Sequence, residues 1–174
     1  MMKLWLGIAA AVTVIDQLTK YAAEAMLEFH QPVVWLPHFN FTLAYNSGAA
    51  FSFLSDQSGW QRWFFVILAL GVCALIIHWL RRVGAAEKAT GLALALILGG
   101  ALGNVIDRLM YGHVVDFIDV YYTTAGYCSV LFSPVPAADG MECHWPAFNI
   151  ADSAISLGAV MMIIASFKSR QEKP

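Results

Sequence analysis

Residues 89–108 read ATGLALALILGGALGNVIDR. The stretch stays free of charge until Asp107, and it is long enough to cross the hydrocarbon core of a bilayer, which takes about 20 mostly apolar residues. It is apolar on every side, as expected of a helix that lipid or protein surrounds. The Gly99-x-x-x-Gly103 spacing within it predicts close packing against a neighbouring helix. This segment therefore indicates a membrane protein.

Three other windows have the same character, at about 4–23, 63–80 and 148–167. Asp16 and Lys20 interrupt the first, the second carries no charge, and Asp152 is the one acid of the last. Hydrophobic residues make up 59% of the chain and charged residues 13%, too few to cover a soluble surface. We expect one integral membrane domain over 1–174, an all-α membrane protein with four transmembrane helices. A cleaved signal peptide in place of the first helix is the alternative, but it would have Asp16 inside its apolar core.

The distribution of Lys and Arg predicts the orientation, because cytoplasmic loops carry more of them. Neither 24–61 nor 111–147 contains a Lys or Arg, which predicts that both segments lie outside. Both termini are then cytoplasmic, and the protein is expected in the bacterial inner membrane with its outer face toward the periplasm. The cations on the other side are Lys3, Arg81, Arg82, Lys88, Lys168, Arg170 and Lys173.

Within the outer segment 29–59, residues 30–37 and 39–45 are rich in β-branched and aromatic residues and are bounded by Pro and Asn. They predict a small extracytoplasmic β-sheet that forms a cradle, with Phe51 and Phe53 toward lipid or substrate. The outer segment 111–147 begins with alternating polarity and then has the turn residues of a loop. A disulfide between Cys128 and Cys143 in it is a hypothesis, since sequence does not establish that the two residues reach each other.

Four acids lie near the outer ends of the predicted spans: Asp16, Asp107, Asp116 and Asp152. Only Lys20 and Arg108 could pair with them locally, so carboxylates are in excess at one depth. Two carboxyls brought together in such a place tend to share one proton. The ionised carboxylate can then activate water while the protonated one polarises a carbonyl, as in aspartic proteases. On the residues alone, a helix cap at Asp152 and a surface acid at Asp116 remain an equal alternative.

Five motifs around these acids resemble, in order, those of the lipoprotein signal peptidases, also called signal peptidase II. They are DQLTK at 16–20, YNSGAAF at 45–51, GALGNVIDRL at 100–109, GHVVDFI at 112–118 and FNIADS at 148–153. The resemblance implies an aspartic endopeptidase with Asp116 and Asp152 as its catalytic pair and no metal or cofactor. It implies prolipoprotein substrates, cut before a diacylglyceryl-modified cysteine. Membrane lipids and globomycin-like inhibitors are the other expected partners.

The remaining motif residues are expected to bind substrate or support the site. Asp16 and Lys20 are four apart and can pair, and Asn104 and Asp107 share one helix face. Asp107 and Arg108 do not face each other, so Arg108 should meet another carboxylate or a lipid phosphate. Asn46 and Asn149 can hold a peptide backbone or the acids themselves. Gly48 would permit a backbone shape closed to other residues. The full supporting set is Asp16, Lys20, Asn46, Gly48, Asn104, Asp107, Arg108, Asn149 and Ala151.

The residues disfavour other functions to different degrees. No basic run indicates nucleic-acid binding, and Cys143-His144 lacks the paired spacing of a zinc site. A small transporter or proton-conducting protein is the main alternative, since membrane acids often line ion paths. It would need polar residues through the depth of the bilayer, whereas these acids gather at one face. A non-enzymatic lipoprotein-binding protein is a third possibility. The segment Thr123–Cys143 is longer than the family pattern predicts.

Overall fold

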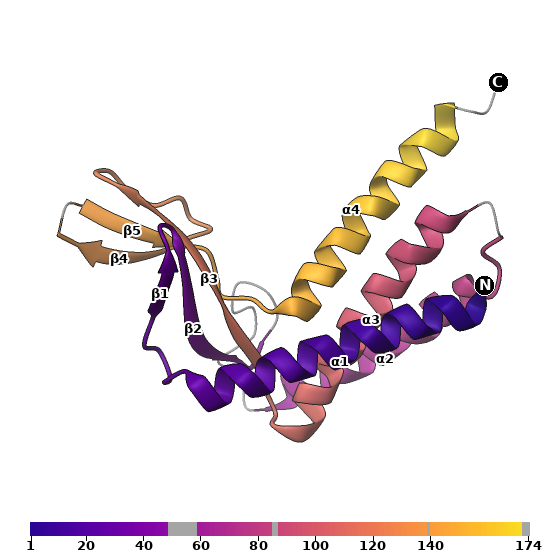
Figure 1. Cartoon of the computed structure of the whole chain (residues 1–174), viewed down its shortest axis with the longest axis horizontal. Helices are drawn as coiled ribbons and strands as arrows, with labels where there is room; N and C mark the ends of the chain where they lie inside the picture. Colours follow the sequence, from indigo (N-terminus) through magenta and orange to yellow (C-terminus); the bar gives the residue numbers. More distant parts are fainter. Residues whose placement is uncertain (49–58, 85–86, 139, 172–174) are drawn as a thin grey trace.

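The computed structural model describes residues 1–48, 59–84, 87–138 and 140–171. It contains four helices that are long and apolar enough to cross a membrane (Figure 1). The predicted Phe51 and Phe53 orientations fall outside the described residues. The helices are α1 (Met2–Met26), α2 (Trp60–Leu80), α3 (Lys88–Met110) and α4 (Ile150–Gln171), of which Ile150–Phe167 has the composition of a span.

Helix α3 lies at the centre and packs against the other three. Of its most apolar window 61% is buried, against 17–22% for the other helices. Small residues make this possible. A Cβ on Gly99 would collide with the Ala9 carbonyl and Val12 of α1, and one on Gly100 would collide with the Ala151 carbonyl of α4. The close packing expected from the glycine spacing is therefore confirmed, since backbones approach closely where side chains are absent.

A five-stranded antiparallel sheet extends from one end of the helices (Figure 1), in the order β1-β2-β3-β5-β4. The two strands expected in the first outer segment are present. The description as all-α was imprecise, because three more strands from the second outer segment join them in the sheet. The strands are β1 (Val33–Leu36), β2 (Phe39–Asn46), β3 (Val114–Thr124), β4 (Ser133–Ala137) and β5 (Gly140–His144).

The segment expected to be a loop, 111–147, holds those three additional strands. Pro134 and Pro136 indicated a turn but lie in β4, which is an edge strand. Proline is tolerated there because an N–H on the open side of the sheet has no strand to bond. Cys128 and Cys143 form a disulfide with their Cα atoms 5.4 Å apart, so the hypothesis of a cross-link is confirmed.

The sheet is joined to the helices through the residues that precede α4. The Phe148 N–H donates to the Ile118 carbonyl at 3.0 Å, and the Ile118 N–H donates back at 2.8 Å. This isolated bridge continues the β3 ladder to the start of α4. It brings Asp116 on β3 and Asp152 on α4 to the same end of the molecule.

The packing of α3 gives a stability prediction. Gly100→Ala forces a methyl group against the backbone of α4 and should lower the free energy of unfolding by about 1–3 kcal/mol, as overpacked cores do. A Cβ at Gly71 in α2 meets nothing within 4 Å. Gly71→Ala should be neutral, or stabilising by up to about 1 kcal/mol. Thermal unfolding in detergent measures both, and equal melting temperatures for the two variants would contradict the packing.

Candidate active site

A cavity of about 910 Å³ lies between the sheet and the ends of α3 and α4. Asp116 and Asp152 both line it, so the structure brings the two expected catalytic residues together. Asn46, Asn104 and Arg108 line it as well. Its other walls are largely apolar, which is the usual character of a binding pocket with a few convergent polar groups.

Asp116 lies on β3, where it pairs with Ala44 of β2, and only 2% of its surface is exposed. Two amides donate to its carboxyl group. Asn149 Nδ2 is 2.7 Å from Oδ1, and Asn46 Nδ2 is 3.2 Å from Oδ2. The two asparagines therefore bind the acid itself, which was one of the two roles expected for them.

Asp152 lies in the first turn of α4. Its carboxylate Oδ1 accepts from Asn104 Nδ2 at 2.8 Å, and its backbone N–H donates to Asn149 Oδ1 at 2.9 Å. Asn149 thus caps the helix three residues before Asp152. The alternative role of Asp152 as the cap is wrong, and the Asp152 side chain is left facing the cavity.

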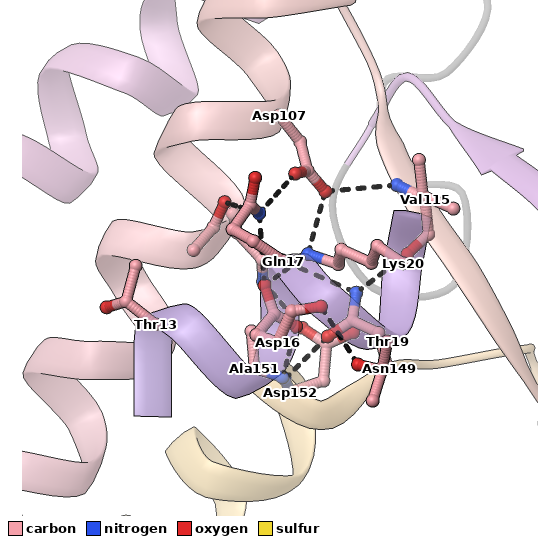
Figure 2. Close-up of polar contacts among 12 residues, drawn as sticks. Thr13, Asp16, Gln17, Thr19, Lys20, Asp107, Val115, Asn149, Ala151 and Asp152 are labelled. Atoms are coloured by element: carbon pink, nitrogen blue, oxygen red, sulfur yellow. Dashed lines mark hydrogen bonds and ion pairs between the residues drawn. The ribbon is translucent and has the colours of Figure 1, made fainter. Parts of the chain in front are cut away.

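Behind the cavity, Lys20 of α1 is buried among acceptors from two helices. Its Nζ lies 2.8 Å from Asp16 Oδ2, 2.7 Å from Asp107 Oδ2 and 2.9 Å from Asn104 Oδ1. Figure 2 shows Lys20 between Asp16 and Asp107. Each ammonium hydrogen has an acceptor, as a buried cation requires. The expected Asp16–Lys20 pair and the shared face of Asn104 and Asp107 are confirmed.

This cluster bonds to the backbone beside both Asp116 and Asp152. Asp107 Oδ2 accepts the N–H of Val115, next to Asp116, at 3.2 Å. Asp16 Oδ1 accepts the N–H of Ala151, next to Asp152, at 2.8 Å (Figure 2). Because lysine can only donate, Asn104 must turn its oxygen to Lys20 and its NH₂ to Asp152. The position of Lys20 thereby sets which end of the Asn104 amide faces the acid.

Arg108 was expected to meet a carboxylate or a lipid phosphate. In the described part of the chain it makes no ion pair with a carboxylate. Its Nη2 donates to the Gly48 carbonyl at 2.9 Å, and Nη1 to the Asn104 carbonyl at 3.3 Å. The guanidinium also lies over the ring of Phe65, 5.3 Å from its centroid. The nearby carboxylates are already bound by amides and by Lys20. The Gly48 N–H donates to Asn46 Oδ1 at 3.0 Å, so Gly48 links Arg108 to the Asn46 that holds Asp116.

Gln17 is a member of the cluster to which the sequence assigned no role. Its Nε2 donates to Asp107 Oδ1 at 2.7 Å and to the Gly103 carbonyl at 3.2 Å. Thr13, one turn earlier, donates to the Gly99 carbonyl of α3 at 2.9 Å. Polar residues at Thr13, Gln17 and Lys20 recur every three or four positions in an apolar helix. That spacing was the available signal for a polar face toward α3.

Burial and the nearby carboxylate of Asp152 raise the pKa of Asp116 from 3.8 to about 7. Hydrogen bonds from Asn46 and Asn149 and the charge of Lys20 act in the opposite direction but are outweighed. Asp116 is therefore about half protonated near neutral pH, beside a second carboxyl in the same cavity. Two such groups can supply an acid and a base at once. Within the described residues, no group of three His, Cys, Asp or Glu side chains could hold a metal ion.

Comparisons with known proteins agree over nearly the whole chain. A family model described as signal peptidase (SPase) II matches residues 8–168. A lipoprotein signal peptidase of Aeromonas hydrophila is 48% identical over 97% of this chain and 91% of its own length. One from Pseudomonas aeruginosa is 47% identical over 96% of this chain and 89% of its own. A solved bacterial membrane enzyme superposes with a TM-score of 0.78 at 30% identity, covering 99% of this chain and 92% of the other.

The pKa of Asp116 gives a prediction about stability and pH. Between pH 3.8 and about 7 the unfolded chain loses this proton while the folded protein keeps it, so stability from this group falls as pH rises through that window. Asp116→Asn cannot ionise and should be more stable than the wild type at pH 8, by more than it is at pH 4. Melting temperatures at both pH values test this. Glu28→Gln, at an exposed acid, serves as the control. An Asp116→Asn advantage independent of pH would contradict the raised pKa.

The Lys20 cluster gives a second prediction. Lys20→Met leaves Asp16 and Asp107, which are 0% and 1% exposed, without their cation. Removing one partner of a buried ion pair costs about 3–5 kcal/mol of unfolding free energy. Lys88→Met, at an exposed lysine, should leave the melting temperature unchanged. A melting temperature for Lys20→Met equal to that of Lys88→Met would show that the cluster does not stabilise the fold.

Proposed function

The chain belongs to the signal peptidase II family, and from that membership we propose that Asp116 and Asp152 are the two carboxyl groups with which it cleaves its substrate. It is a multi-pass membrane enzyme, a lipoprotein signal peptidase that removes signal peptides from lipoprotein precursors. One observation of the structure supports the assignment of the two residues. Both carboxyls line a single cavity, and each is held there by an asparagine amide.

In this proposal Asp116 carries the shared proton. Its pKa of about 7 leaves it about half protonated at neutral pH, where an ordinary aspartate has already lost its proton. The amides of Asn46 and Asn149 then stabilise the carboxylate that remains once the proton has been given away. Asp116 is thus suited to polarise the carbonyl of the scissile bond by donating a hydrogen bond to its oxygen.

Asp152 is the general base. It lies in the first turn of α4, where the helix dipole favours a negative charge, and the Asn104 amide donates to it at 2.8 Å. Lys20 supports this role from behind, because it holds the Asn104 oxygen and so leaves the Asn104 NH₂ for Asp152.

The reaction then needs only one water and the two carboxyls. Asp152 takes a proton as the water oxygen bonds to the carbonyl carbon, and Asp116 gives its proton to the carbonyl oxygen. When the carbon–nitrogen bond breaks, Asp152 passes its proton to the leaving nitrogen. At the same time, one of the two hydroxyls on that carbon becomes the carbonyl of the new carboxylic acid and returns its proton to Asp116, so both residues regain their starting state.

The cavity also suits a substrate that joins peptide and lipid. Ala44 and Asn46 of the sheet line one side, while Ile155 and Ser156 line the other along α4. A peptide on the sheet and acyl chains along the helix would meet between them, at the two acids. This supports cleavage just before a cysteine that carries diacylglycerol, and a globomycin-like peptide would compete for the same space.

The proposed setting is the bacterial inner membrane, with 1–174 as one integral domain. The apolar surfaces of α1, α2 and α4 would contact lipid. Arg81 and Arg82 at the end of α2 and Lys3 at the start of α1 would lie in the cytoplasm with both termini. The cavity and the sheet would then be periplasmic.

Cleavage of a diacylglyceryl-prolipoprotein by the purified protein tests the pair. Asp116→Asn and Asp152→Asn should each lower the rate at least about a hundredfold, since each removes a step of proton transfer. Both variants should still bind the lipopeptide. A chelator should leave the rate unchanged, and inhibition by EDTA would point to a metal mechanism instead.

Asp119→Asn is the matched control. Asp119 is a buried acid on the same strand, and it accepts from Thr42 Oγ1 at 3.1 Å and pairs with His144 at 2.8 Å rather than lining the cavity. Cleavage by Asp119→Asn at close to the wild-type rate is expected. Near-normal cleavage by either cavity variant would overturn the assignment of the pair.

A further inference from the structure

Part of the wall of the catalytic cavity comes from the chain between β3 and β4, residues 125–132. Val130, Leu131 and Phe132 line the same cavity as Asp116 and Asp152. Val130 is 98% exposed and Leu131 is 49% exposed. Two neighbouring apolar side chains that line the cavity are thus largely uncovered, which suits them to contact an apolar part of the substrate.

Two anchors hold this wall, one on each side of Val130 and Leu131. Before them, Cys128 is bonded to Cys143 of β5, a residue with no exposed surface. After them, the Phe132 ring packs edge-on against Tyr122 and against Trp145, with centroids 5.0 and 5.4 Å apart. Val130 and Leu131 are therefore held in place by a covalent cross-link on one side and an aromatic contact on the other.

Little else fixes the segment in place. Its hydrogen bonds among the described residues are local. Gly126 donates to Thr124 at 3.1 Å, and the Phe132 N–H donates to the Ser129 carbonyl at 2.9 Å. Without the disulfide, the residues from 125 to 131 would be joined to the sheet only at their ends. Substrate binding would then have to order these residues, and the conformational entropy lost in doing so would lower the affinity.

We propose that the Cys128–Cys143 disulfide positions Val130 and Leu131 to bind the peptide part of the substrate, so that opening the disulfide weakens substrate binding while the chemical step stays intact. This inference rests on the proposed function of the cavity. The cross-link acts through the wall and does not touch the reacting atoms, so Cys128 and Cys143 are positioning residues.

The position of this wall indicates that it contacts the peptide part of the substrate and not the lipid part. Residues 125–132 connect two strands of the sheet, whereas Ile155 and Ser156 line the cavity from the membrane-spanning helix α4. Acyl chains would lie along α4. Apolar residues of the peptide next to the scissile bond would then lie on the side of Val130 and Leu131.

Reduction gives the first test, with KM and kcat measured on a diacylglyceryl-prolipoprotein peptide. A phosphine reductant supplies two electrons, so the disulfide becomes two thiols and the phosphine takes the oxygen of one water. KM should rise about five- to tenfold, the factor expected for ordering two side chains on binding. The value of kcat should stay within about twofold, because neither acid is displaced.

Cysteine variants separate this effect from other consequences of reduction. Cys128→Ser combined with Cys143→Ser should show the same raised KM and no further response to the phosphine. Cys73→Ser removes the buried free cysteine of α2 and should respond as the wild type does. A KM in the double variant equal to that of the wild type would overturn the proposal.

A second test keeps the disulfide intact and asks whether Val130 and Leu131 contact the substrate. It can be carried out even if the double cysteine variant does not fold. Val130→Ala combined with Leu131→Ala should raise KM about tenfold, as loss of apolar contacts does. The increase should shrink with a substrate whose apolar residues next to the scissile bond are serine. Val135→Ala is the control, since Val135 is an exposed valine of β4 outside the cavity wall. An unchanged KM in the Val130/Leu131 variant would refute contact with substrate.

The two proposals fail in different ways. If the dyad assignment is wrong, Asp116→Asn or Asp152→Asn still cleaves, whatever the state of the disulfide. If only the positioning role is wrong, those variants are inactive while reduction and the Val130/Leu131 changes leave KM unchanged.

Discussion

The burial of one ammonium group organises this molecule. Lys20 is 3% exposed and meets Asp16, Asp107 and Asn104 at 2.7–2.9 Å. An unpaired charge in such a place would be very costly, so the three acceptors must converge on it. They come from α1 and α3, and Asp16 also binds the first turn of α4 through Ala151. One cation thereby constrains three helices at the depth where the two catalytic candidates lie.

The cluster needs helices that approach closely, and the small residues of α3 allow this. A Cβ on Gly103 would collide with the carboxylate of Asp16, and one on Gly100 with the backbone of α4. The same approach brings Asn104 within 2.8 Å of Asp152. Packing and site geometry are therefore not separable here, because the glycines that permit the helix contact also leave the space in which the polar side chains meet.

The sheet supplies the second acid of the cavity, which no helix carries. It carries Asp116 on β3 to the cavity, and the bridge between Ile118 and Phe148 holds that strand to the start of α4. Its far part was mistaken for a loop because Pro134 and Pro136 are turn residues in most contexts. At an edge they do not interrupt a ladder, and only the strand order reveals that β4 is an edge. Local chemistry could not distinguish the two cases.

The sequence by itself determined four apolar helices, two of the strands, the pairing of Asp16 with Lys20 and the identity of the two candidate acids. The helices, the strands and the ion pair follow from local composition and spacing, since a helix places residues three or four apart on one face. The two acids were identified by the resemblance of the motifs around them to those of the signal peptidase II family. Only the tertiary structure decided that Arg108 bonds carbonyl oxygens, that Gln17 joins the cluster, and that Cys128 reaches Cys143. Each of these depends on which distant segments become neighbours. Such contacts are set by the packing of the whole chain. Spacing along the sequence can indicate a polar face, as at Gln17, but not which distant segment that face meets.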